Sequence, residues 1–197
     1  MALPLLYFVR HGETDWNAQG RFQGQRDIPL NATGRAQARR NGAFLRQTLG
    51  DALGRFDFVA SPLSRAAETM RLVRAELGLP ETGYRSDERL VELHYGGWEG
   101  RTFVELRGLD AALMDRREAD KWRFVPPGTG AESYEILALR IQPVLDALKG
   151  PTVMVAHGGI ARVLLLAYGG MTPQHAAHVG IPQDRVLRIE NERAIWL

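Results

Sequence analysis

The sequence predicts an α/β fold, a three-layer sandwich in which a mainly parallel central sheet is flanked by helices. Two observations support this prediction. Short apolar runs, rich in β-branched and aromatic residues, alternate with longer segments of helical periodicity. No repeat, low-complexity tract or linker interrupts the alternation, and 197 residues with 45% hydrophobic side chains can bury a full core. We therefore expect a single domain over residues 1–197.

Three apolar runs have the length and composition of buried parallel strands: Leu5–Val9 (LLYFV), Phe56–Ala60 (FDFVA) and Thr152–Ala156 (TVMVA). Each run is followed at once by a polar cluster. The clusters are Arg10-His11-Gly12, Ser61-Pro62-Leu63-Ser64-Arg65 and His157-Gly158-Gly159. Because ligands of open parallel sheets bind beyond the carboxyl ends of the strands, we expect the three clusters to meet at one edge.

The segment Asn31–Leu49 predicts the first long helix. Asn31 is a favourable capping residue, and the apolar positions include Ala36, Phe44 and Leu45. Four arginines lie largely on another side of this helix: Arg35, Arg39, Arg40 and Arg46. We interpret them as a solvated face rather than a binding patch, because arginine side chains are mostly exposed.

The next helix is predicted to begin at Ser61-Pro62 and to run to about Leu77. Serine is a good N-cap, and proline suits the first helical turn. This start places Arg65 in the opening turn, where its side chain can join free backbone amides in facing an anion.

Two further helices are predicted in the second half of the chain. One covers Ser133–Leu148 with a kink or break near Pro143, and the other covers Ile160–Tyr168. The stretch Arg107–Thr129 is weakly patterned, and we expect it to form part of a small helical, loop-rich insertion over the site.

Composition narrows the possible partners. The chain has 25 basic and 23 acidic residues, so its formal charge of +2 argues against nucleic acid or an anionic membrane as a partner. The absence of cysteine excludes disulfides and a thiolate nucleophile. No apolar run reaches ~18 residues and no cleavage signature is seen, so we expect a cytoplasmic protein, either a monomer or a homo-oligomer.

Two histidines follow apolar strands in the same way, in "VRHGET" and in "VAHGGI". Each histidine, His11 and His157, precedes a glycine that lets the backbone approach a ligand. Histidine can act as a covalent nucleophile, and the guanidinium groups of Arg10 and Arg65 can hold the oxygens of a phosphoryl group without a metal. The set therefore predicts a phosphate-sized pocket with two histidines.

The whole chain resembles the histidine phosphatase superfamily, also called the phosphoglycerate mutase-like family. Six motifs occur in the order which that family shows: "RHGETDWN", "GQRDIPLNATGRAQA", "SPLSRAAET", "LVELHYGGWEG", "PPGTGAES" and "VAHGG". The resemblance implies that His11 becomes phosphorylated and that Glu92 is the proton donor. It further implies that the following residues line the phosphate and substrate pocket: Arg10, Asn17, Gln23, Gly24, Arg65, His157 and Gly158.

The residues alone favour Glu92 less strongly than the resemblance does. Its neighbourhood also offers Glu88 and Glu99, and isolated carboxylates are usually exposed. The chemistry agrees with the assignment, because an alkoxide leaving group needs a proton and the attacking water must later lose one. One carboxyl group can serve both steps.

We expect neither a metal nor another cofactor. His175 and His178 are spaced for one helical face, but no further ligands complete a metal set. His94 is expected to lie near the site without reacting. No P-loop signature and no serine-hydrolase elbow occurs in the sequence.

The predicted function is a metal-independent phosphatase acting on small phosphorylated metabolites. The first alternative is a cofactor-dependent phosphoglycerate mutase. Mutases of the family carry a lysine where this sequence reads Arg101-Thr102-Phe103, and the chain is short for a covering insertion. Arg116 and Arg117 keep the alternative open, since they could grip a substrate carboxylate, although exposed helix charge is their commoner role. The second alternative is a non-catalytic phosphate-sensing or scaffold protein, because a fold alone does not guarantee activity.

Overall fold

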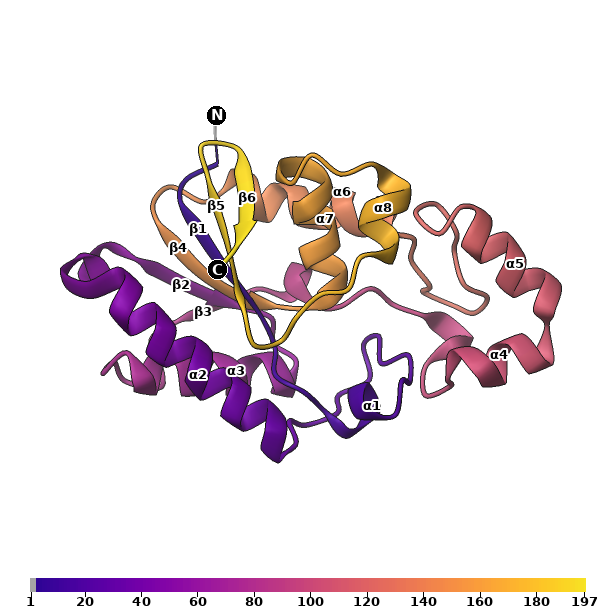
Figure 1. The fold of residues 1–197 in the computed structure, drawn as a ribbon, viewed down its shortest axis with the longest axis horizontal. Coiled ribbons are helices and arrows are strands. Elements are labelled where there is room, and N and C mark those ends of the chain that lie inside the picture. Colours follow the sequence, from indigo (N-terminus) through magenta and orange to yellow (C-terminus); the bar gives the residue numbers. More distant parts are fainter. Residues whose placement is uncertain (1–2) are drawn as a thin grey trace.

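A six-stranded sheet runs through the middle of the molecule and carries helices on both faces (Figure 1). The computed structural model describes residues 3–197. The strands are β1 (Leu6–Arg10), β2 (Asp57–Ala60), β3 (Arg85–Ser86), β4 (Thr152–Ala156), β5 (Val186–Glu190) and β6 (Arg193–Trp196). Their order is β3-β2-β4-β1-β5-β6: the first four strands are parallel, β5 is antiparallel to β1, and β6 is antiparallel to β5. The predicted α/β class with a mainly parallel sheet is confirmed.

Two helical layers cover the sheet (Figure 1). The helices are α1 (Asp15–Ala18), α2 (Ala32–Leu49), α3 (Ser64–Glu76), α4 (Phe103–Leu109), α5 (Ala111–Ala119), α6 (Tyr134–Asp146), α7 (Gly158–Tyr168) and α8 (Pro173–His178). Helices α2 and α3 share one hydrophobic cluster with the sheet, and α6 and α7 share another on the opposite face. In residues 3–197, no helix has both the length and the apolar character needed to cross a membrane.

Alternate side chains of β1 serve the two layers, as the period of two in a strand requires. Leu6 and Phe8 pack with α6 and α7, whereas Tyr7 and Val9 pack with α2 and α3. The strand is therefore covered on both faces, which explains why it reads as a continuous apolar run.

The connections diverge at the carboxyl ends of β1 and β4, which are neighbours in the sheet. After β1 the chain passes to α2 on one face, and after β4 it passes to α7 on the other. Such a divergence opens a crevice between the two strand ends, the usual place for a ligand in an open α/β sheet. His11 and His157 are the first residues beyond these strands.

Strands β3, β5 and β6 and the short helices α1 and α8 were not predicted from the sequence. Strands β5 and β6 form a hairpin at the β1 edge, turning at Asn191 and Glu192, which both have positive φ. The signal that could have revealed the hairpin is the alternation of apolar and charged residues from Leu187 to Glu190, followed by a polar turn and the apolar run Ala194–Trp196. Asn-Glu is a weaker turn signal than Asn-Gly, because glutamate, unlike glycine, does not favour a backbone conformation with positive φ.

Helix boundaries required corrections. Asn31 caps α2 as predicted, but Ala36 is exposed, and the buried face includes Ala38, Leu45 and Leu49. Ser61 does not cap α3, which begins at Ser64, because Ser61 extends the β2 ladder by donating its amide to Val155. The Ser64 amide is instead accepted by Asp27 from a distant loop, at 2.8 Å.

Two later helices also differ from the predicted bounds. Helix α7 begins at Gly158 rather than at Ile160, with His157 at its N-cap. Helix α6 continues through Pro143 to Asp146. The insertion is helical, as predicted: α4 and α5 project at one end of the molecule around Trp98, Leu106 and Met114 (Figure 1).

Candidate active site

A cavity of about 140 Å³ opens where β1 and β4 end. The predicted site residues line it with the exception of His157, which is fully buried beside His11. The lining consists of Arg10, His11, Asn17, Arg21, Phe22, Gln23, Gly24, Arg65, Glu92, Tyr95, Gly158 and Arg162. Segments that are far apart in the sequence therefore meet at one small polar site.

His11 is buried, with 2% of its surface exposed. Its Nδ1 donates a hydrogen bond to the carbonyl of Gly12 at 2.7 Å, because a carbonyl can only accept. In the neutral ring Nε2 is then unprotonated, and Arg65 Nε donates to it at 3.3 Å. Burial and the charges of Arg65 and Arg10 hold the pKa of His11 well below its usual 6.5. The ring is therefore neutral at pH 7 and directs a lone pair into the cavity.

His157 lies beside His11, with the two ring centroids 5.1 Å apart. It is fully buried, and its pKa is lowered by that burial and by the neighbouring Arg65, His11 and Arg10. Its Nε2 is 2.7 Å from the hydroxyl of Ser61. Its Nδ1 is buried and has no hydrogen-bond partner among residues 3–197. One nitrogen of His157 is thus fixed, and the other is left for a ligand.

Arg65 joins helix α3 to the loop that covers the cavity. Its Nη1 donates to the carbonyl of Arg26 and its Nη2 to the carbonyl of Gly24, both at 2.7 Å. Three donors of its planar fork are engaged, counting Nε, so the remaining N–H groups are free for a phosphoryl oxygen. The predicted position in the first turn of the helix is confirmed.

Arg10 and Arg162 place two further guanidinium groups at Gly158. A β-carbon at this glycine would lie 3.3 Å from Arg162 Nη1 and 3.5 Å from Arg10 Nε. Burial and the charge of Arg162 lower the pKa of Arg10 to about 10. The Nε atoms of both arginines are buried without a partner in the described part of the chain. Unsatisfied buried donors are costly, and an anionic ligand would satisfy them.

Arg162 was missed by the sequence reasoning. It lies on α7, one helical turn beyond Gly158, so the i, i+4 spacing brings both residues to the same face. That spacing within "HGGIAR" is the signal that could have found it.

Asn17 contributes an amide to the cavity. Its Oδ1 accepts from the Thr14 amide at 3.2 Å and from Gln183 Nε2 at 3.1 Å. Because both donors fix the oxygen, the NH₂ group is left to face a ligand. Gln183 also donates to the carbonyl of His11 at 3.1 Å, so one residue supports both parts of the "RHGETDWN" motif.

Gln23 and Gly24 belong to the loop above the cavity. Gln23 is buried, and its Oε1 accepts the Thr14 hydroxyl at 2.9 Å. Gly24 has a φ of +54°, and a β-carbon there would lie 2.0 Å from Oε1 of Glu99. Glu99 in turn accepts the amide of Gln25 at 2.9 Å. Glycine at position 24 is therefore required by both conformation and space.

Glu92 lines the cavity and is 9% exposed. Its Oε1 accepts the Leu93 amide at 2.8 Å, and its two oxygens accept the Gly159 amide at 3.1 and 3.2 Å. A β-carbon at Gly159 would lie 2.3 Å from Oε1, so glycine permits this approach. The carboxylate is held at the first turn of α7, close to His157.

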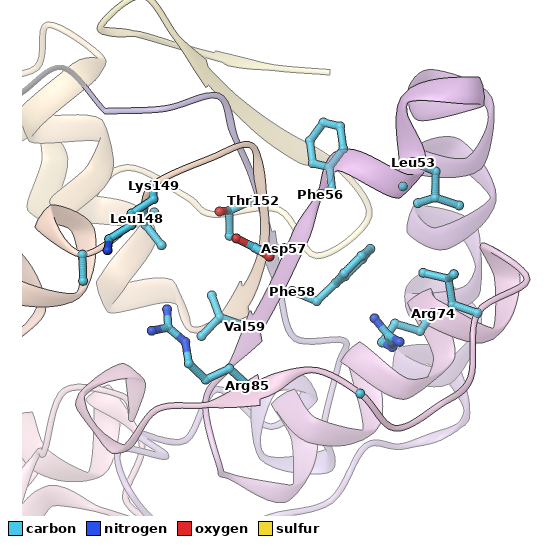
Figure 2. A pocket seen from close by; sticks show the side chains of 14 residues that line it. Leu53, Phe56, Asp57, Phe58, Val59, Arg74, Arg85, Leu148, Lys149 and Thr152 are labelled. Carbon is cyan, nitrogen blue, oxygen red and sulfur yellow. The ribbon is translucent and has the colours of Figure 1, made fainter.

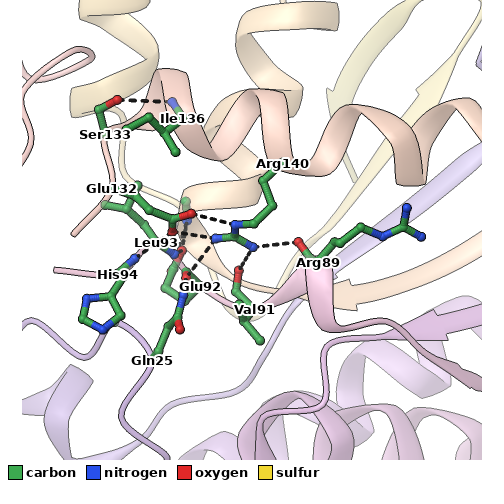
Figure 3. A network of polar contacts seen from close by, with 12 residues as sticks. Gln25, Arg89, Val91, Glu92, Leu93, His94, Glu132, Ser133, Ile136 and Arg140 are labelled. Carbon is green, nitrogen blue, oxygen red and sulfur yellow. Dashed lines mark hydrogen bonds and ion pairs between the residues drawn. The ribbon is translucent and has the colours of Figure 1, made fainter. Parts of the chain in front are cut away.

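Arg140 holds the main chain around Glu92 (Figure 3). Its N–H donors reach the carbonyls of Arg89, Val91 and Glu92 and both carboxylate oxygens of Glu132, at 2.7 to 3.2 Å. Glu132 also accepts the amide of His94 at 3.1 Å. His94 thus lies near the site without lining the cavity.

The arginine pair of the insertion lies outside the cavity. Arg116 is exposed, as expected. Arg117 is not, and the expectation of an exposed charge is wrong there: its guanidinium lies 5.4 Å from the centroid of Phe22 and pairs with Glu118. The Arg117 cation is therefore stabilised by the ring of Phe22 and by the carboxylate of Glu118.

A larger cavity, of about 570 Å³, lies at the amino ends of β2 and β4 (Figure 2). Asp57 and Thr152 mark these strand ends, opposite to His11 and His157. Its lining includes Phe58, Arg85 and Lys149 but no histidine. The described lining of the larger cavity has cations but offers neither a histidine nucleophile nor a glutamate, and both line the smaller cavity.

Across residues 3–197, no group of three or more metal-ligating side chains is assembled. His178 donates from Nδ1 to the carbonyl of Gln174 at 2.8 Å, and its Nε2 lies 3.1 Å from Glu118. His175 and His178 therefore lie on the exposed surface of α8.

The lowered pKa values of His11 and His157 predict an acid-sensitive fold. Both rings stay neutral when folded but take up protons once unfolded, so the free energy of unfolding should fall as the pH drops below about 6.5. The slope should reach up to ~1.4 kcal/mol per pH unit for each histidine. Denaturant titrations between pH 7 and 5 measure it. His11→Asn should reduce the slope. An unchanged slope in His11→Asn would contradict the buried neutral ring.

Comparison with known proteins agrees with this geometry. The family model described as "Histidine phosphatase superfamily (branch 1)" matches residues 6–196. The 2,3-bisphosphoglycerate-dependent phosphoglycerate mutase 2 of Gloeobacter violaceus is 33% identical over 190 residues, covering 91% of this chain and 82% of that protein.

Solved structures are similar over almost the full length. Mycobacterial hydrolase 1 superposes with a TM-score of 0.80 at 27% identity, covering 99% of this chain and 97% of that one. A mycobacterial glucosyl-3-phosphoglycerate phosphatase superposes with a TM-score of 0.77 at 27% identity, covering 95% and 90%. With the sheet, the paired histidines and a family match over nearly every residue in agreement, the chain belongs to branch 1 of the histidine phosphatase superfamily.

Proposed function

We propose that this protein is a metal-independent phosphatase, which hydrolyses small phosphomonoesters through a phosphohistidine on His11. The observation that carries the proposal is the content of one cavity. An unprotonated Nε2 on a neutral histidine, four arginine side chains and one carboxyl group surround a space of about 140 Å³. A cytoplasmic location belongs to the same proposal.

In the first step the lone pair of His11 Nε2 attacks phosphorus and the P–O ester bond breaks. The oxygens of the transferring phosphoryl group are held by Arg10, Arg65 and the amide of Asn17. The two guanidinium groups neutralise the negative charge on these oxygens, a role that a metal ion has in other phosphoryl-transfer enzymes. His157 adds its free Nδ1 to this set. The departing alkoxide takes a proton from Glu92 and leaves as the alcohol.

In the second step water attacks the phosphohistidine. Glu92, now ionised, takes the proton from that water, the P–N bond breaks and inorganic phosphate is released. Oε1 of Glu92 already accepts two amides, whereas Oε2 shares only that of Gly159. Oε2 is therefore the oxygen free to carry the proton in both directions.

The insertion supports hydrolysis over mutase chemistry. A mutase must keep water away from the phosphohistidine. Within residues 3–197, no residue of α4 or α5 lines the cavity, and Arg117 is engaged with Phe22 and Glu118. The insertion therefore adds to the described lining no basic side chain that would help to exclude water.

The second candidate is a phosphoglycerate mutase. The name of the Gloeobacter relative favours it, as do the unused donors of Arg162 and Arg10, which suit a substrate with a further anionic group. Sequence identity of 33% leaves room for either chemistry on one scaffold.

One experiment separates these functions. p-Nitrophenyl phosphate and 3-phosphoglycerate with catalytic 2,3-bisphosphoglycerate are supplied separately, with and without a strong chelator. We expect steady release of phosphate from the aryl ester, slow or no isomerisation, and the same rates with chelator. Rapid formation of 2-phosphoglycerate with negligible phosphate release would establish the mutase. Thermal stabilisation by phosphate without any turnover would establish a non-catalytic phosphate sensor.

The Arg140 network predicts a coupled loss of activity and stability. Arg140→Met removes the donor from the Glu92 carbonyl and leaves Glu132, whose side chain is 13% exposed, unpaired. The free energy of unfolding should fall by ~3 kcal/mol, and kcat should fall by about 10- to 100-fold as Glu92 shifts. In the double variant Arg140→Met/Glu132→Gln, stability should partly recover while kcat stays low. A normal kcat in Arg140→Met would show that Glu92 is held by its own amide contacts alone.

A further inference from the structure

Ser61 and His157 make one of the most enclosed polar contacts of the protein. Both residues are completely buried, and the Ser61 hydroxyl lies 2.7 Å from Nε2 of His157 across 96 positions of sequence. The sequence reasoning gave this serine the role of a helix cap, which the structure contradicts. A buried hydroxyl directed at a ring that packs against His11, which lines the cavity, needs another explanation.

The contact has two possible polarities, because a hydroxyl can donate or accept. If Ser61 donates to Nε2, neutral His157 carries its proton on Nδ1. If Ser61 accepts from Nε2, then Nδ1 is a bare lone pair. Among residues 3–197 Nδ1 has no partner, and it points away from Ser61 because the two nitrogens lie on opposite sides of the ring.

One observation and one chemical argument select the first polarity. Within residues 3–197 the completely buried Ser61 hydroxyl contacts the Leu63 amide at 3.4 Å, which can only donate, and Nε2 of His157, so its own hydrogen finds an acceptor only if Nε2 is unprotonated. A phosphoryl oxygen that approaches Nδ1 would be repelled by a lone pair and attracted by an N–H. Arg65, Arg10 and the His11 ring surround His157 and disfavour a second proton, so the neutral ring must hold its one proton on the correct nitrogen.

We propose that Ser61 is a positioning residue: its hydroxyl donates to Nε2 of His157 and thereby fixes the Nδ1–H tautomer that binds the phosphoryl group. The role rests on the proposed function, since it names what sets the phosphate contact at that site. His11 and His157 then carry the same tautomer for different purposes. The Gly12 carbonyl leaves His11 with a bare Nε2 for attack, and Ser61 leaves His157 with an N–H for binding.

Nitrogen-15 NMR of the histidine rings tests this without any variant, because protonated and bare ring nitrogens have well-separated shifts. At pH 7, with and without saturating inorganic phosphate, we expect His157 to show a protonated Nδ1 and a bare Nε2. A protonated Nε2 with a bare Nδ1, or a ring protonated on both nitrogens, would overturn the proposal. The result does not depend on turnover, so it stands apart from the test of the phosphatase.

Three serine and threonine variants complete the test. Ser61→Ala should give a mixture of His157 tautomers and weaken binding of inorganic phosphate by about tenfold. Ser61→Thr should restore both, since the position before Pro62 favours the extended backbone that β-branched residues adopt. Ser64→Ala is the matched control. Within residues 3–197 the hydroxyl of Ser64 makes no hydrogen bond, and its backbone amide, which donates to Asp27, is kept in the variant. Unchanged tautomer and phosphate affinity in Ser61→Ala would reject the role.

Discussion

His11→Ala should have no detectable phosphatase activity, a fall of roughly 10⁴-fold or more, while the protein stays folded and still binds inorganic phosphate. The covalent route needs the bare Nε2 of His11, and in the structure no other neutral ring nitrogen lines the described cavity. Arg10 and Arg65 remain in the variant, so the phosphate site keeps most of its charge. The loss should therefore appear in kcat rather than in phosphate affinity.

The intermediate can be trapped in the wild-type enzyme. Phosphohistidine is a phosphoramidate, which acid hydrolyses and alkali preserves, so an alkaline quench during turnover should leave one phosphoryl group on His11. An acid quench should release it. The exposed His175→Ala is the control and should be labelled like wild type. Wild-type-like activity in His11→Ala, or a label on another residue, would end the proposed mechanism.

Glu92→Gln should separate the two chemical steps. The amide keeps the shape and the acceptor oxygen but cannot supply a proton, and general acid catalysis is typically worth ~10²–10⁴ in rate. For an alkyl phosphate, formation of the phosphohistidine should fall by about this factor. For p-nitrophenyl phosphate, the phenolate leaves without help and His11 should still be phosphorylated at an appreciable rate.

The second step still lacks its base in this variant. Phosphohistidine should therefore accumulate with p-nitrophenyl phosphate, and stopped-flow traces should show a burst followed by a slow phase. Glu13→Gln is the matched control: Glu13 does not line the cavity, and the new amide oxygen can still accept from Asn31, now at 2.9 Å. Equal slowing of both substrates without a burst would show that Glu92 shapes the pocket and that the proton donor is another group.

The central strands and several site residues could be predicted from the sequence. The strands at β1 and β4 were predicted because each is a short apolar run that ends at a polar cluster, and β4 has the predicted bounds. Arg10, His11 and Gly158 were predicted because they lie at or just beyond the ends of those strands, so local order along the chain already places them at the sheet edge. Arg65 followed from its position near a helix start. These signals span only a few residues, which is why they can be read without a structure.

Tertiary structure decided what lies across the cavity. Ser61 looks like a helix cap from its neighbours, yet β2 and β4 are paired, and their register brings it to His157. Gln183 has ordinary local surroundings and becomes a site residue only because its segment is packed beside the end of β1.

The polarity of the site was decided in the same way. A sequence shows which groups can ionise, but their pKa values depend on burial and on charges brought in from other segments. His11 is neutral because the fold buries it between Arg10, its neighbour in sequence, and Arg65, from another helix. The residue types of the site are thus written in the sequence, whereas their protonation states and partners are set by packing, since desolvation and Coulomb interactions act through space and not along the chain.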